Sequence, residues 1–123
     1  MNVAVLGASL NPEKYSNMAV HLLAEKGHRV FPVNPTFKKI GPHDVYPSLS
    51  ALPEPVDTLT LYVSKDVSNK LKPEILAVKP KRIIFNPGAE NQELEAEAAR
   101  LGIEALRACT LVLLKTGQFT PKQ

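Results

Sequence analysis

Residues 3–12 read Val3-Ala4-Val5-Leu6-Gly7-Ala8-Ser9-Leu10-Asn11-Pro12, and a helical pattern begins soon after them, near Tyr15. The stretch predicts a short strand, a turn of small residues and a helix, the order in which α/β sheets build phosphate sites. Small residues let the backbone approach an anion closely. Of the three glycines in the dinucleotide fingerprint G-x-G-x-x-G, however, only Gly7 is present. The stretch therefore predicts a Rossmann-type nucleotide site that is not a standard NAD site.

The alternation of apolar runs and helical patterns continues along the chain. Strands are predicted over 2–6, 29–33, 57–63, 81–85 and 103–107, and helices over 15–26, 66–77 with a bend at Pro73, 91–101 and 111–114. Residues 34–55 are expected to be mostly loop with one helical turn at 48–52, and the polar tail 117–123 is expected to fray. Strands separated by helices imply parallel pairing through right-handed crossovers. We expect an α/β, Rossmann-like, doubly wound parallel sheet of about five strands, in the order 3-2-1-4-5, forming a single domain over 1–123.

Composition limits the class of protein. The 123 residues are 44% hydrophobic, which suffices for a core, and the net charge is +3. The positive charge agrees with an anionic small-molecule ligand. Lysine and arginine are spread along the chain rather than clustered, so we expect no nucleic acid. The start lacks a signal peptide and no run is long enough to cross a bilayer, so we expect a soluble cytoplasmic protein without a membrane partner.

Small, polar or turn-forming residues follow each predicted strand, at the edge where ligands of such sheets bind. The first turn is the best candidate for a diphosphate site. The backbone N–H groups of this turn and the Ser9 hydroxyl are predicted to hold the anion, and Lys14 and Ser16 to add a charge and a donor. The alternative interpretation is a tight strand-to-helix turn with a serine cap.

The end of the second strand bears on which nucleotide binds. An NAD site places Asp or Glu there for the ribose hydroxyls, but this chain has Val33-Asn34-Pro35. A neutral Asn34 followed by Lys38 and Lys39 better suits a ribose that carries a phosphate. The alternative is a simple Asn-Pro turn.

A family resemblance rests on motifs spread over about residues 3–119. They are Gly7-Ala8-Ser9 with Asn11-Pro12, Val33-Asn34-Pro35, Gly41, Tyr46, Ser48-Leu49, Val56-Asp57, Asn86-Pro87-Gly88 with Asn91, and Cys109. In these the chain resembles the small stand-alone CoA-binding proteins, which are similar to the CoA-binding domain of the succinyl-CoA synthetase α subunit. The resemblance implies a Rossmann-like fold that holds coenzyme A without supplying a reaction.

The resemblance also implies roles for individual residues. The turn from Gly7 to Asn11, including Ala8 and Ser9, would take the diphosphate together with Lys14 and Ser16. Val33, Asn34, Pro35 and Lys39 would lie near the adenosine end. Asn86 and Gly88 would lie near the pantetheine arm.

Catalytic and metal-binding patterns are not evident. His21, His28 and His43 lack metal-ligand spacing, and no serine sits in a nucleophile-elbow pattern. Cys109 follows the fifth strand and is either a buried small residue or a reactive thiol at the ligand's sulfur end.

Several functions remain open beside non-catalytic binding of CoA or acyl-CoA. The chain could be an NAD(P)-binding enzyme or redox sensor, or a non-catalytic subunit of a larger acyl-CoA enzyme. It could also be a redox-responsive protein that stores CoA as a disulfide on Cys109. The further candidate partners are a second copy of the chain, forming a homo-oligomer, and a partner enzyme.

Overall fold

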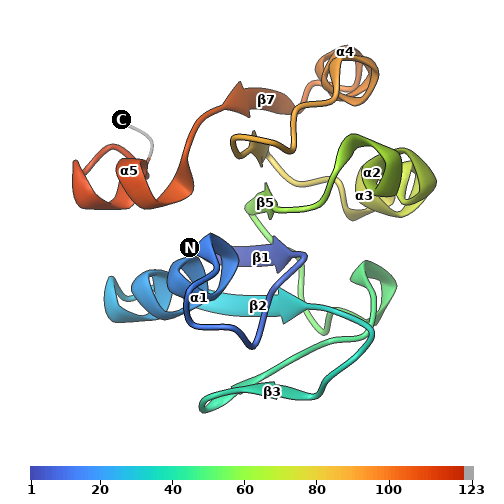
Figure 1. Cartoon of the computed structure of the whole chain (residues 1–123). Coiled ribbons are helices and arrows are strands. Elements are labelled where there is room, and N and C mark those ends of the chain that lie inside the picture. Colours follow the sequence, from blue (N-terminus) through green and yellow to red (C-terminus); the bar gives the residue numbers. More distant parts are fainter. Residues whose placement is uncertain (121–123) are drawn as a thin grey trace.

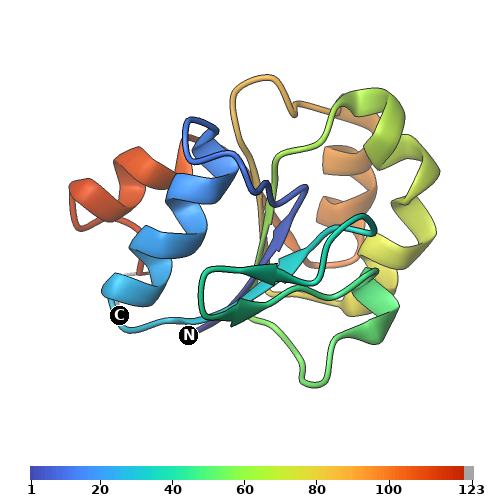
Figure 2. The same cartoon turned by 60° about the horizontal axis from the view of Figure 1, so that its bottom comes forward.

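The computed structural model describes residues 1–120 and shows one parallel five-stranded sheet between two layers of helices (Figures 1 and 2). The elements are β1 (Asn2–Leu6), α1 (Tyr15–Glu25), β2 (Arg29–Val33), β3 (Lys39–Ile40), β4 (His43–Asp44), η1 (Leu49–Ala51), β5 (Thr58–Leu61), α2 (Lys65–Lys70), α3 (Lys72–Val78), β6 (Arg82–Phe85), α4 (Gln92–Arg100), β7 (Glu104–Arg107) and α5 (Thr110–Lys115). The predicted Rossmann-like α/β class is confirmed.

Each face of the sheet has its own apolar core. Helices α1 and α5 cover one face, and α2, α3 and α4 cover the other (Figure 2). Val5, Leu23 and Leu114 belong to the first core, and Leu59 and Leu94 to the second. The strands β5 and β6 are buried along their whole length. Apolar burial on both faces is what a central parallel strand requires.

The predicted strand order was wrong. The observed order is β2-β1-β5-β6-β7, so the third predicted strand lies beside the first, on the side away from the second. Burial explains the difference, because the fully buried β5 suits an interior position. Pro32, in β2, has no N–H for a second ladder and suits the sheet edge, where β2 lies.

The long connection between β2 and β5 is more ordered than predicted. A short antiparallel hairpin of β3 and β4 forms around Gly41 and Pro42, and a bridge joins Val33 to Tyr46. The predicted helical turn is present as η1. Two-residue strands are too short to give a periodic signal, which is why the hairpin was missed.

The carboxyl-terminal segment is packed as far as it is described. Phe119 is 2% exposed, so the prediction that the tail frays from Gly117 was wrong for this part of it. Residues 121–123 of that predicted tail lie outside the described residues.

Candidate functional site

The strand order reverses between β1 and β5, and a ligand of such a sheet binds beyond the carboxyl ends of its strands at that point. Gly7 follows β1 there with φ +90°, a backbone conformation that residues with a Cβ rarely adopt. A Cβ on Gly7 would lie 2.8 Å from Val63 Cγ1 and 3.1 Å from the Tyr62 carbonyl oxygen. The turn therefore needs glycine both for its conformation and for its space.

Backbone hydrogen bonds hold this turn against the neighbouring strand. The N–H groups of Gly7 and Ala8 both donate to the Val33 carbonyl, at 3.1 and 3.3 Å. Asn34 Nδ2 donates to the Ala8 carbonyl at 2.9 Å, and Asn34 Oδ1 accepts from the Thr36 N–H and hydroxyl. The side chain of Asn34 thus joins the ends of β1 and β2.

The rest of the loop leads into α1 through side-chain hydrogen bonds. Ser9 Oγ accepts from the Asn11 N–H at 3.1 Å, and Asn11 Oδ1 accepts from the Glu13 N–H at 3.0 Å. Asn17 Nδ2 donates to the Ser9 carbonyl at 2.9 Å. Within residues 1–120 the first three N–H groups of α1 have no hydrogen-bond partner. These donors at a helix N-terminus attract an anion.

A pocket of about 310 Å³ opens at this edge, and we call it the switch-point pocket. It spans from the start of α1 to the ends of β5, β6 and β7. Its lining residues are Glu13, Lys14, Tyr15, Ser16, Tyr62, Asn86, Pro87 and Cys109. Four predicted site residues from three parts of the chain meet here: Lys14, Ser16, Asn86 and Cys109.

Asn86 is 2% exposed, and its side chain is fully engaged within the protein. Nδ2 donates to Thr60 Oγ1 at 2.7 Å and to the Leu61 carbonyl at 2.8 Å, and Oδ1 accepts from the Thr110 N–H at 2.9 Å. These bonds connect β5, β6 and α5 beneath the pocket. The side chain of Asn86 therefore shapes the pocket floor.

Gly88 is exposed and does not line the switch-point pocket. Its N–H donates to Glu90 Oε1 at 2.9 Å. Asn86 therefore lines the pocket and Gly88 does not, although both were predicted to lie near the same part of the ligand.

Tyr62 is a pocket residue that sequence reasoning missed. Its hydroxyl is a buried side-chain oxygen without a hydrogen-bond partner in residues 1–120. The nearby Thr60 and Thr110 hydroxyls bond to each other at 2.7 Å. Burial raises the pKa of Tyr62 to about 12, while hydrogen bonding toward Thr110 and Thr60 opposes the shift and Cys109 adds to it, so the hydroxyl faces the threonine pair. The predicted strand over 57–63 included Tyr62, whereas β5 ends at Leu61, so its place after the strand was not evident from the sequence.

A second, smaller pocket of about 190 Å³ adjoins the end of β2, and we call it the hairpin pocket. It is lined by Asn34, Pro35, Thr36, Phe37, Lys38, Val45 and Pro47. Lys39 is not among them, and its Nζ lies 3.3 Å from Asp44 Oδ1 across the β3–β4 hairpin. Of the two lysines discussed from the sequence, Lys38 is the one at this pocket.

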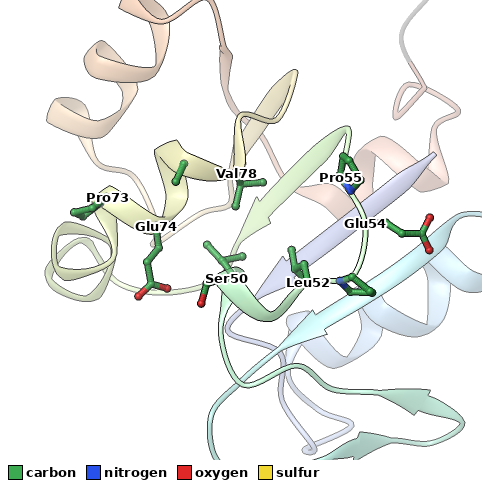
Figure 3. A pocket seen from close by; sticks show the side chains of 10 residues that line it. Ser50, Leu52, Glu54, Pro55, Pro73, Glu74 and Val78 are labelled. Atoms are coloured by element: carbon green, nitrogen blue, oxygen red, sulfur yellow. The ribbon is translucent and has the colours of Figure 1, made fainter.

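A cavity larger than the switch-point pocket lies elsewhere, between residues 49–55 and α3, with a volume of about 550 Å³ (Figure 3). Its walls are mostly proline and aliphatic side chains, with Glu54 and Glu74 on opposite walls. Glu54 is bound by Arg29, whose guanidinium donates to Oε1 at 2.8 Å. The residues that line the cavity include two carboxylates and no Lys, Arg or His, so this cavity does not suit an anion, and we place the candidate site at the carboxyl edge.

Residues 1–120 contain no group of three His, Cys, Asp or Glu side chains arranged to hold a metal ion. None of the helices described is long and apolar enough to cross a membrane.

Comparison with known proteins adds a family and several related folds. A family model described as a CoA binding domain matches residues 1–115. A crystal structure of an uncharacterized protein is similar at 35% identity and TM-score 0.88, over 96% of this chain and 97% of that one. The Thermus thermophilus protein cell-free ID.343 is similar at 30% identity and TM-score 0.88, over 96% of this chain and 90% of that one.

A larger enzyme contains a similar region. The acetyl-coenzyme A synthetase 1 of Ca. Korarchaeum cryptofilum, solved with phosphate and ADP, matches at 28% identity and TM-score 0.72. The match covers 86% of this chain but 25% of the synthetase chain.

Proposed function

Because this chain belongs to the family of CoA-binding domains, we propose that it binds coenzyme A, free or as an acyl-CoA, at the carboxyl edge of its sheet. The observation that carries the proposal is the family match, together with a pocket and unpaired N–H groups at the switch point. In this proposal the chain binds without chemistry of its own.

The diphosphate is assigned to the loop from Gly7 to Asn11 and the first turn of α1. Because the N–H groups of Gly7 and Ala8 bond to Val33, the proposed donors are the unpaired N–H groups of α1. Lys14 is exposed beside them and supplies positive charge, and Ser16 supplies a hydroxyl. Ser9 and Asn11 act by holding the loop in shape.

The adenosine end is assigned to the hairpin pocket, beside Val33, Asn34 and Pro35. Its proposed phosphate ligand is Lys38 rather than Lys39, since Lys38 lines this pocket and Lys39 does not. The pantetheine arm is assigned to the switch-point pocket, above Asn86 and toward Cys109. Gly88, which follows Asn86 in the same loop, is assigned to the outer edge of the arm's path and not to the pocket lining.

Calorimetric titration of the purified protein with CoA tests the proposal. We expect binding heat, a higher melting temperature with CoA, and weaker binding of NAD and ADP. Absence of both heat and a melting shift at millimolar CoA contradicts the proposal. Tighter binding of NAD than of CoA supports the NAD(P)-binding alternative instead.

The assignment of Lys38 gives a test with a matched control. A charge-assisted contact contributes about 1.5–3 kcal/mol, so Lys38→Ala should weaken CoA binding roughly tenfold or more. Dephospho-CoA, which lacks the 3′-phosphate, should bind the variant as it binds the wild type. Lys39→Ala, the neighbouring change, should alter CoA affinity much less. The reverse order would return the role to Lys39.

Cys109 is half-buried, and in the alternative function it would hold CoA covalently as a disulfide. Its thiolate would attack CoA disulfide, forming a mixed disulfide and releasing one CoA thiol. Intact mass after incubation with CoA disulfide measures this directly. No added mass, or the same mass on Cys109→Ser, means that Cys109 serves only in packing.

A second role consistent with binding alone is that of a non-catalytic subunit of a larger acyl-CoA enzyme. The Korarchaeum synthetase has a similar region as 25% of its chain. Purification of this chain from its native host, with identification of any stoichiometric companion, tests that role.

A further inference from the structure

The cavity between residues 49–55 and α3 is a groove with a firm floor, and we call it the proline groove (Figure 3). Leu49, Leu52 and Val78 line it, and all three belong to or pack against the apolar core on this face of the sheet. Three prolines stand on its walls, two in the loop and one in the first turn of α3. Because proline fixes its own φ, these walls are stiff before any ligand arrives. A volume of about 550 Å³ lies within the range of small-molecule sites.

The charge of the proline groove is negative and is balanced on one wall only. Arg29 binds Glu54, and Figure 3 shows the Glu54 side chain extending away from the other labelled side chains. Glu74 extends toward Ser50 in the same view and forms no ion pair within residues 1–120. Lys72, two positions before Glu74, is paired with two glutamates of α4. The groove therefore leaves one negative charge for a ligand to neutralise.

An aliphatic ligand with one ammonium group matches both features of the groove. Its chain covers apolar walls that otherwise face water, and each methylene removed from water adds to the free energy of binding. Its ammonium group lies against the Glu74 carboxylate, which has no other cation beside it in the described chain. A ligand that carries a carboxylate is rejected, because like charges then meet.

We propose that the proline groove is a second binding site, for an aliphatic amine, and that Glu74 binds its ammonium group. The groove shares no lining residue with the switch-point pocket or the hairpin pocket. Its two walls lead into the amino ends of β5 and β6, whereas the candidate CoA site lies beyond the carboxyl ends of the strands. The proposal therefore does not rest on the binding of CoA.

The experiment is an NMR titration of the ¹⁵N-labelled chain with three ligands of equal chain length: hexan-1-amine, hexan-1-ol and hexanoate. We expect the amine to bind about two- to fivefold more tightly than the alcohol, the range of an exposed ion pair, and hexanoate to bind least. Butan-1-amine should bind roughly three- to fifteenfold more weakly than hexan-1-amine, because it lacks two methylenes. The amide signals that shift should be those of residues 49–54 and 74–78.

Glu74→Gln removes the charge at the groove, and Glu25→Gln is the matched control that removes the same charge from α1. Glu74→Gln should lower the affinity for hexan-1-amine to that for hexan-1-ol and leave the affinity for the alcohol unchanged. Glu25 is exposed, does not line the groove and forms no ion pair within residues 1–120. Its substitution should therefore leave the binding of all the ligands unchanged.

The proposal is overturned if the three six-carbon ligands bind alike, if the signals that shift lie outside the groove, or if Glu74→Gln binds the amine like the wild type. It is also overturned if the groove signals shift when the protein alone is diluted. That result would show that a second copy of the chain, and not a small amine, occupies the groove.

Discussion

At the scale of single residues, Gly7 shows how one position serves both conformation and space. Its φ of +90° is matched at Gly27, where φ is +89°. The two differ in their surroundings: a Cβ at Gly27 would meet nothing within 4 Å, whereas a Cβ at Gly7 would meet Val63 and Tyr62. The pair therefore separates the cost of strain from the cost of crowding.

Gly27→Ala should lower the free energy of unfolding by about 1–3 kcal/mol through backbone strain alone. Gly7→Ala should lower it by a further 1–3 kcal/mol or so, because Val63 and the Tyr62 backbone must also shift. Urea unfolding of both variants measures the difference. Equal losses would show that the turn at Gly7 has room for a methyl group.

At the scale of elements, one buried amide connects three of them beneath the candidate site. Asn86 links its own position after β6 to β5 and to the start of α5. Because these bonds lie between elements, they fix the relative positions of the residues that line the switch-point pocket.

Asn86→Ala removes these hydrogen bonds and leaves the Thr110 N–H without its partner. We expect the free energy of unfolding to fall by about 2–4 kcal/mol, at roughly 1 kcal/mol for each bond plus the cost of the unpaired group. Asn2→Ala, which loses one exposed bond to the Pro55 carbonyl, is the control and should cost less than about 1 kcal/mol. Similar losses in chemical denaturation would argue against the linking role of Asn86.

At the scale of the whole molecule, Phe119 near the end of the described chain packs close to its first strand. Arg82 donates to the Phe119 carbonyl at 2.8 Å, and its guanidinium lies over the Phe119 ring at 4.6 Å. The His28 ring packs edge-on against the same ring, 5.1 Å away, and His28 Nδ1 lies 3.1 Å from the Met1 amine. Partial burial, the Met1 amine and Arg82 together lower the pKa of His28 from 6.5.

This shift predicts a pH dependence of stability with a definite sign. The unfolded chain binds a proton at His28 more readily than the folded protein does, so stability falls as pH decreases below about 6.5. Above that pH the group is neutral in both states and the effect vanishes. His28→Gln should flatten the melting-temperature profile between neutral pH and the folded pKa of His28. An unchanged profile would mean that His28 does not contribute.

The sequence by itself determined the class of fold and the place of the turn. Apolar runs alternating with helical patterns specify strands and helices locally, and Gly7 marks a backbone conformation that few other residues adopt. Such features depend on neighbours along the chain, so they are visible in a single sequence. The edge position of β2 was also readable from Pro32, although the predicted order overlooked it.

Tertiary structure alone decided how these parts meet. The unpaired hydroxyl of Tyr62, the pairing of Lys39 with Asp44 and the burial of Phe119 against Arg82 depend on contacts between separate elements. The Phe119–Arg82 contact joins residues 37 positions apart. Such contacts form only when the chain has packed, because burial and hydrogen-bond satisfaction are properties of the surroundings in space and not of a residue's place in the sequence.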